Sequence, residues 1–497
     1  MGGEPDEQGV SLTVGMETPS FALPPVEETP EPSGPTGDGD GATTVSTTLA
    51  APPTLLPPPP PPPPVPVSPS LPEGQAGDEL PERGADRRQR RRRRRRRVGI
   101  GAVVVIVVVA GLVVVQLRRP LPSTGVHTTL ASSLVVPGQA PTLPWPSTGY
   151  GAVSIPSLGY KAQSGPEVPV PVASLTKMMV ALIILQDHPL TAGVDGPSIT
   201  ITAQDVAEDS SDVSTDQSTV PVNVGEVLTE RQLLEGLLIR SANNMAFTLA
   251  QWDAGSLPAF VAKMNAGASR LGMTQTHYVD VSGYNPGSVS TPADSLKVAA
   301  QGLADPTFAA IVAMPTVTLP VVGQVNNIVT QVGTNGIVGV KSGFTTAAGP
   351  CLVLATNRTV GGRTVQAIAA VTNQPATATN TFGAAGLVDE GLMQAALSAV
   401  ADQPVAVAGH AVGTVGASWG GSRHDVPVET AQAASVLAVP GQALTITVTD
   451  RPVATGTDAG TVVGHVAYTL GPQRQVASLR PTERVPAPSL WWRLTRT

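Results

Sequence analysis

The chain has 497 residues, enough for two or three domains. Its only cysteine, Cys351, excludes an intrachain disulfide and a cysteine-based zinc cluster. The formal net charge of −7 argues against a chain devoted to nucleic acid.

The N-terminal segment, residues 1–97, has the composition of a disordered chain that ends in a run of arginines. Residues 1–82 contain no Lys or Arg and include an unbroken proline block, Pro57–Pro64. Because so polar a segment buries too little to offset its ordering entropy, we expect disorder, with polyproline II over the prolines. The proline block is either a ligand for a cytoplasmic partner or a solvated spacer, and the spacer is the simpler interpretation.

Residues 98–117 form the predicted transmembrane helix. Val98–Val115 has no polar side chain, and as a helix it would be about 27 Å long, close to the hydrocarbon thickness of a bilayer. Ten arginines lie within Arg87–Arg97, whereas only Arg118 and Arg119 follow the apolar run. This asymmetry predicts a single-pass protein of a bacterial cell membrane, with a cytoplasmic N-terminus and an extracytoplasmic catalytic domain. A cleaved signal peptide would lie nearer the N-terminus.

The remaining chain divides into three stretches. Residues 118–148 are rich in Pro, Ser and Thr and are expected to be an extracytoplasmic linker. Residues 149–402 show helix and strand periodicities together. Residues 403–497 contain short Val-, Thr- and Ala-rich runs, such as Ala443–Thr449, which predict a small β-rich domain. Near the end, Trp491–Trp492 either touches the membrane interface or packs on this domain, and we favour packing.

The first short motif in residues 149–402 is Ser174-Leu175-Thr176-Lys177. Ser174 precedes an apolar run, Met178–Leu185, and serine is an ordinary residue at a helix start. Lys177 lies one turn further on the same face. A buried lysine loses proton affinity and can accept the proton of the serine hydroxyl, although S-x-x-K alone is common by chance.

The second motif, Ser241-Ala242-Asn243, lies in a short polar turn between two predicted helices. The first helix begins with a capping-box pattern at Thr229 and Gln232. Such a turn usually only connects two helices, but it can also present a hydroxyl and an amide to a cleft.

The third motif, Lys341-Ser342-Gly343, continues a β-branched run. Three successive runs predict an antiparallel meander: Ile337–Val340, Cys351–Thr356 and Val365–Val371. Lys341 and Ser342 can bind a carboxylate, and Gly343 allows a substrate backbone to approach closely. The alternative is a strand that ends in a solvated turn.

In this order, S-x-x-K, S-x-N and K-[ST]-G are the motifs of penicillin-binding proteins and serine β-lactamases. The surrounding sequence resembles the D-alanyl-D-alanine carboxypeptidase family over roughly residues 149–400. The segments that carry this resemblance are Val172–Met179, Val224–Asn244, Thr276–Tyr278, Ser282–Tyr284 and Gly339–Gly349. Ser342 stands where the family usually has threonine, and the long N-terminal segment is a second departure.

The resemblance implies an α/β (α+β) penicillin-binding-protein/β-lactamase-like domain, with an antiparallel sheet and a helical lobe, acting in the cell wall. Ser174 would attack the carbonyl between the last two D-alanines of a peptidoglycan stem pentapeptide, and Lys177 would take its proton. Ser241 would pass a proton to the leaving amine, while Asn243 would hold the peptide backbone and Lys177.

The resemblance also implies how the substrate terminus is bound. Lys341 and Ser342 would contact the terminal carboxylate, beside Gly343. The backbone N–H groups of Ser174 and Phe344 would face the oxyanion. β-Lactams would be covalent inhibitors, and neither a metal nor another cofactor is implied.

Three alternatives remain open. Class A β-lactamases have S-D-N and a downstream glutamate, whereas this chain has Ala242 and no glutamate in residues 247–298. A catalytically weak peptidoglycan-binding scaffold would be compatible with Ser342 in place of threonine, but the other motif residues are intact. A transpeptidase would use the same chemistry with an amine acceptor in place of water. A zinc carboxypeptidase is disfavoured because no histidine pair has the H-E-x-x-H spacing.

Overall fold

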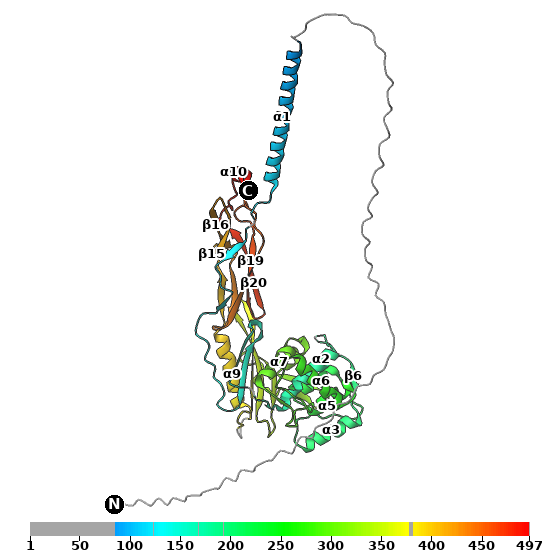
Figure 1. Cartoon of the computed structure of the whole chain (residues 1–497). Coiled ribbons are helices and arrows are strands. Elements are labelled where there is room, and N and C mark those ends of the chain that lie inside the picture. Colours follow the sequence, from blue (N-terminus) through cyan, green and yellow to red (C-terminus); the bar gives the residue numbers. More distant parts are fainter. Residues whose placement is uncertain (1–84, 123, 167, 192, 377–380, 497) are drawn as a thin grey trace, which may run out of the picture. The chain divides into compact units, whose positions relative to one another are not determined.

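The computed structural model describes residues 85–122, 124–166, 168–191, 193–376 and 381–496 (Figure 1). The acidic segment and the proline block lie outside the described residues, so disorder and polyproline II there stay predictions. The chain divides into two units, Met1–Arg88 and Gln89–Thr497. The elements below belong to the second unit, apart from the first residues of α1.

The apolar segment is helical, and helix α1 spans Ala85–Arg118. In the described part of the chain it is the one helix long and apolar enough to cross a membrane, by length and composition. Its apolar side chains are exposed, as a lipid-facing surface requires. We expected residues up to 97 to be disordered, and this boundary is wrong for residues 85–97. Arginine is a good helix former, and it extends a helix that the apolar segment has already nucleated.

The catalytic region is built on a five-stranded antiparallel sheet. Its strand order is β11 (Ile337–Gly343), β12 (Cys351–Val360), β13 (Arg363–Thr372), β3 (Tyr150–Ile155) and β4 (Tyr160–Gln163). The predicted three-strand meander is confirmed by the register of β11 on β12 and of β12 on β13. Alternate residues of β12 belong to two different cores, since Val353 packs with the helical lobe and Leu354 with α9.

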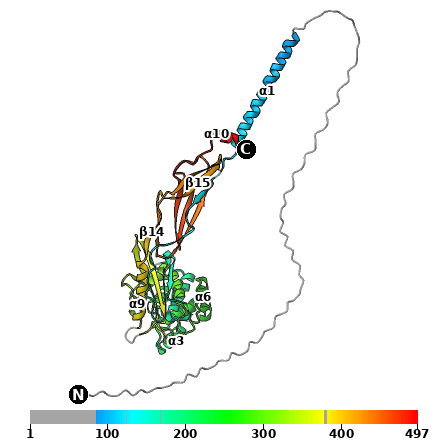
Figure 2. The ribbon, with the colours of Figure 1, turned by 60° about the vertical axis from the view of Figure 1, so that its left-hand side comes forward.

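Helices cover both faces of this sheet (Figures 1 and 2). Helix α9 (Gly383–Ser398) packs on one face, against β12, β13 and β3. On the other face, α2 (Thr176–Asp187) forms the centre of the lobe, and its residues from Thr176 to Leu185 are all buried. The surrounding helices are α3 (Ala203–Ser214), α4 (Glu230–Ile239), α5 (Asn243–Ala254), α6 (Leu257–Arg270), α7 (Pro292–Leu303) and α8 (Pro306–Val312).

Short two-stranded ribbons complete the lobe. They pair β5 (Val170–Pro171) with β8 (Val289–Ser290), β6 (Ser198–Thr200) with β7 (Val227–Thr229), and β9 (Thr316–Leu319) with β10 (Gly323–Asn326). The predicted capping box is present at the start of α4, where Thr229 and Gln232 bond reciprocally. This cap fixes the helix that leads to the second motif.

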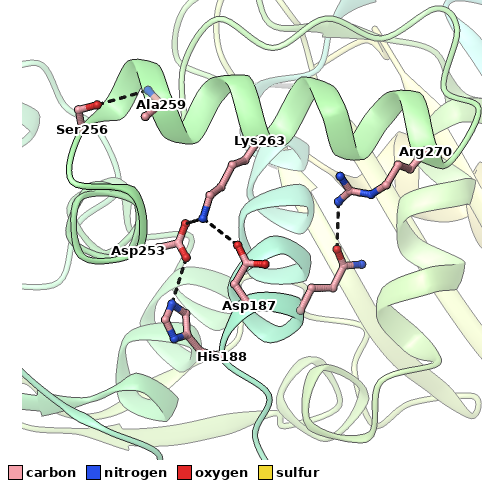
Figure 3. A network of polar contacts seen from close by, with 8 residues as sticks. Asp187, His188, Asp253, Ser256, Ala259, Lys263 and Arg270 are labelled. Atoms are coloured by element: carbon pink, nitrogen blue, oxygen red, sulfur yellow. Dashed lines mark hydrogen bonds and ion pairs between the residues drawn. The ribbon is translucent and has the colours of Figure 1, made fainter. Parts of the chain in front are cut away.

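A polar network joins three helices of the lobe (Figure 3). The Lys263 ammonium of α6 lies 2.8 Å from Asp187 of α2 and 2.6 Å from Asp253 of α5. His188 contacts the other oxygen of Asp253 at 3.0 Å. The Asp253 side chain is only 2% exposed. Its partners therefore compensate a carboxylate that has been removed from water.

A second sheet contains most of the C-terminal residues. Its order is β1 (Val126–Thr128), β15 (Ala411–Trp419), β16 (Ser422–Thr430), β20 (Gln473–Pro481), β19 (Gly464–Leu470), β18 (Ala443–Asp450) and β2 (Ser133–Val135). Strands β14 (Ala401–Ala406) and β17 (Ala434–Ala438) pair separately. The predicted strand at Ala443–Thr449 is confirmed.

Two expectations near this sheet are wrong. Residues 118–148 were expected to be a linker, but β1 and β2 form its two edges, because short polar edge strands gain ladder hydrogen bonds without an apolar pattern. We also favoured packing for Trp491–Trp492. In α10 (Leu490–Thr495) the Trp491 side chain is 76% exposed.

Candidate active site

Ser174 lies in a 3-10 turn, Ala173–Leu175, directly before α2. Ala173 takes a left-handed φ of 47°. The N-cap of α2 is Leu175 and makes no side-chain cap bond, so capping does not explain Ser174. Instead, the Ser174 Oγ accepts a hydrogen bond of 2.8 Å from the Lys177 Nζ. The serine is half-buried, with the lysine behind it.

Lys177 is held as a potential base. Burial lowers the pKa of its ammonium to about 7, against the opposing charges of Asp280 and Asp212. Its second hydrogen bond runs 3.0 Å to the Ser282 carbonyl oxygen. At neutral pH a substantial fraction of this lysine is therefore unprotonated, within reach of the serine proton.

A second serine–lysine pair joins the other two motifs. Ser241 occupies the turn between α4 and α5 with a left-handed φ of 61°. Its Oγ accepts a hydrogen bond of 2.8 Å from the Nζ of Lys341, which also donates to the Ser342 carbonyl at 2.8 Å. Burial, together with the charge of Lys177, holds the pKa of Lys341 well below its usual range. The turn thus presents a hydroxyl at the site, as the sequence suggested.

Asn243 does not contact Lys177 as expected. Its amide Nδ2 donates to the Gln217 Oε1, while the lysine bonds Ser174 and the Ser282 carbonyl. The sequence gave no signal for Gln217. The Ser282 carbonyl belongs to a family-like segment to which we had assigned no role.

The third motif supplies a free hydroxyl and a close backbone contact. Ser342 is 2% exposed, and its Oγ has no hydrogen-bond partner among the described residues. A Cβ on Gly343 would lie 2.7 Å from the backbone nitrogen of Ser174. We expected Gly343 to admit a substrate backbone, but the segment that presses on it is that of Ser174. Any side chain at Gly343 would displace that segment.

These groups meet at a cavity of about 650 Å³. Six predicted residues line it: Ser174, Ser241, Asn243, Ser342, Gly343 and Phe344. Lys177 and Lys341 are buried behind the serine hydroxyls. The geometry supports a serine nucleophile with a lysine base, and a second hydroxyl–lysine pair on the far side of the same cavity.

Comparison with known proteins gives consistent matches. The family model described as D-alanyl-D-alanine carboxypeptidase matches residues 162–376. D-alanyl-D-alanine carboxypeptidase DacB2 of Mycobacterium tuberculosis is 36% identical over 200 residues, covering 39% of this chain and 64% of that protein. D-alanyl-D-alanine carboxypeptidase of Streptomyces sp. (strain K15) is 33% identical over 209 residues, covering 39% of this chain and 69% of that protein. The chain thus spans about two thirds of the length of these relatives.

Solved structures match as well. The Streptomyces K15 DD-transpeptidase is 25% identical, with a TM-score of 0.45, and the match covers 52% of this chain and 100% of that one. The D-alanyl-D-alanine carboxypeptidase DacD of Francisella tularensis is 19% identical, with a TM-score of 0.49, and the match covers 71% of this chain and 97% of that one.

Proposed function

Because the chain belongs to the D-alanyl-D-alanine carboxypeptidase family, we propose that it releases the terminal D-alanine of peptidoglycan stem peptides through an acyl-enzyme on Ser174. The observation that carries this proposal is the hydrogen bond from a fully buried Lys177 to the Ser174 hydroxyl, 2.8 Å long, in a cavity that also contains the other two motifs.

Acylation would begin at the first serine–lysine pair. Lys177 takes the Ser174 proton as the Oγ–carbon bond forms. The carbon–nitrogen bond to D-alanine then breaks, and Ser241 protonates the departing amine. The Lys341 ammonium, bonded to Ser241, can replace that proton. Water then attacks the ester, and the Ser174 hydroxyl is regenerated.

The substrate carboxylate would lie at the third motif. The unpartnered Ser342 Oγ is a free donor there. A carboxylate close to Lys341 would favour the charged form of that lysine, against the effect of burial. The N–H groups of Ser174 and Phe344 would then face the developing oxyanion.

Helix α1 would anchor the enzyme in the bacterial cell membrane. The arginine excess before the apolar segment favours a cytoplasmic N-terminus, which leaves the catalytic residues outside with the cell wall. The proline block, on the cytoplasmic side, would be a spacer or a partner ligand.

The test uses the full chain in detergent, with a pentapeptide ending in D-Ala-D-Ala and, separately, a β-lactam. We expect free D-alanine, and a covalent adduct on Ser174 that outlasts many turnovers, because no class A-type glutamate is available to activate water. Ser174→Ala should give neither product.

The alternatives give different outcomes in the same test. Rapid loss of the adduct with accumulating hydrolysed drug would indicate a β-lactamase. A folded chain that gives neither adduct nor D-alanine would indicate a scaffold.

A further inference from the structure

A second cavity, of about 490 Å³, lies beside the catalytic one. The two cavities share four lining residues: Gln217, Asn243, Ser282 and Tyr284. No residue of the third motif lines the second cavity. It therefore adjoins the side of the catalytic cavity formed by Asn243, and not the side that would bind the terminal carboxylate.

The wall of this second cavity combines an apolar floor with acidic groups. Phe247 of α5 and Val261 of α6 contribute to the floor. Glu208 and Asp212 project from α3, which packs against α5 (Figure 1), and Asp280 adds a third carboxylate. An apolar surface that ends in carboxylates is complementary to an aliphatic chain with a terminal cation.

Asp212 is the unsatisfied member of this group. Its side chain is 5% exposed, and its Oδ2 has no hydrogen-bond partner among the described residues. The Asp280 carboxylate, by contrast, accepts bonds from the hydroxyls of Ser282 and Ser288. A buried carboxylate oxygen without a donor is costly. A ligand that brought an N–H donor into the cavity would remove that cost.

The charge state of Asp212 is compatible with binding a cation. Burial and the nearby Glu208 raise the pKa of this carboxyl to about 6, while the charge of Lys177 lowers it. Asp212 is therefore mostly ionised at neutral pH. An ammonium ion in the cavity would stabilise that form further.

We propose that this cavity binds the side chain of the substrate residue that precedes the two D-alanines, and that it selects an aliphatic side chain ending in a primary amine. This inference rests on the proposed function. If the third motif binds the terminal carboxylate and Asn243 the peptide backbone, the preceding side chain extends past Asn243. Its stem then lies on Phe247 and Val261, and its ammonium meets Asp212, with Glu208 beside it.

The test compares two peptides that differ only in one charge. Both end in D-Ala-D-Ala and are preceded by lysine, whose side-chain amine is free in one peptide and acetylated in the other. For the full chain we expect kcat/KM to be about 10- to 100-fold higher for the free amine, the range of a charge-assisted hydrogen bond. Equal values for the two peptides would overturn the proposal.

Variants assign the preference to the cavity. Asp212→Asn should reduce the ratio of the two kcat/KM values to within about threefold of unity, while Glu208→Gln should reduce it less, because a more exposed charge contributes less. Asp216→Asn is the matched control. It removes the same charge from an exposed residue that does not line this cavity, and asparagine tolerates its φ of 55°. It should keep the preference.

The ratio separates substrate recognition from support of the base. If Asp212→Asn slows both peptides by the same factor, Asp212 acts only through Lys177 and the proposed subsite is wrong. Binding of both peptides to Ser174→Ala, measured by calorimetry, tests the subsite without turnover. Tighter binding of the free amine there would support the subsite even if the wild-type chain released no D-alanine, a result that would refute the proposed function alone. Equal binding would refute the subsite.

Discussion

At the residue scale, Lys177 should determine how acylation depends on pH. Because its pKa is lowered to about 7 by burial, the neutral form that accepts the Ser174 proton is lost as pH falls. The second-order rate constant for acylation by a β-lactam should therefore rise about tenfold per unit below pH 7 and level off above it. Stopped-flow measurement across this range checks the prediction. A flat profile would mean that another group accepts the proton.

Ser342 is predicted to recognise the terminal carboxylate. Its Oγ is buried at the cavity without a partner, so Ser342→Ala leaves no protein donor unsatisfied. The variant should weaken turnover of a peptide with a free C-terminal carboxylate by about 1.5–3 kcal/mol, the scale of a hydrogen bond to a charged group. An ester analogue without that carboxylate serves as the control and should lose less. Equal losses would remove this role.

The residues that were predictable from sequence differ in kind from those that were not. Ser174 and Lys177 are one helical turn apart, so their contact follows from local geometry. The bond between Lys341 and Ser241 joins residues 100 positions apart, and only the family motif order indicated it. Gln217 and the Ser282 carbonyl carry no motif, because any chain segment can supply an amide or a carbonyl at such a place.

At the scale of elements, local signals predicted well where they were strong. The capping box at Thr229 and the meander β11–β12–β13 were both expected and are present. Strands β1 and β2 were missed, because most of their side chains are exposed and their stability comes from pairing with β15 and β18. That pairing depends on residues almost 300 positions away, and no local pattern reports it.

The network around Asp253 should contribute to the stability of the helical lobe. Lys263→Met removes one cationic partner from a carboxylate that is 2% exposed. Since the Lys263 side chain itself is 40% exposed, we expect a loss of only about 1 kcal/mol in the free energy of unfolding. Urea denaturation measures it.

The matched control is Arg270→Met on the same helix. Its single bond to Gln186 is exposed and 3.3 Å long, so its loss should stay within about 0.5 kcal/mol. The network residues do not line the catalytic cavity, so D-alanine release should persist in both variants. Equal destabilisation by the two changes would show that the buried Asp253 gains nothing from Lys263.

At the scale of the whole molecule, the catalytic domain is an insertion in the β domain. Strands β1 and β2 precede it in the chain and β15 to β20 follow it, yet all of them except β17 belong to one sheet. The segment that leaves α1 is therefore tied into folded structure within a few residues, from Thr124 onward. The expected long spacer between the helix and the folded domains is correspondingly short.

The orientation of the chain across the membrane is the last prediction, and it depends on charge. Eight consecutive arginines, Arg90 to Arg97, precede the apolar run, whereas Arg118 and Arg119 follow it. Positive residues near a span are retained on the cytoplasmic side. Protease added to spheroplasts should therefore digest the catalytic domain and spare an N-terminal tag, while both should be lost after detergent lysis. Replacing the eight arginines with glutamine removes the asymmetry and should give a mixed population. Digestion of the tag with survival of the catalytic domain would reverse the orientation, and it would place Ser174 on the opposite side of the membrane from the peptidoglycan.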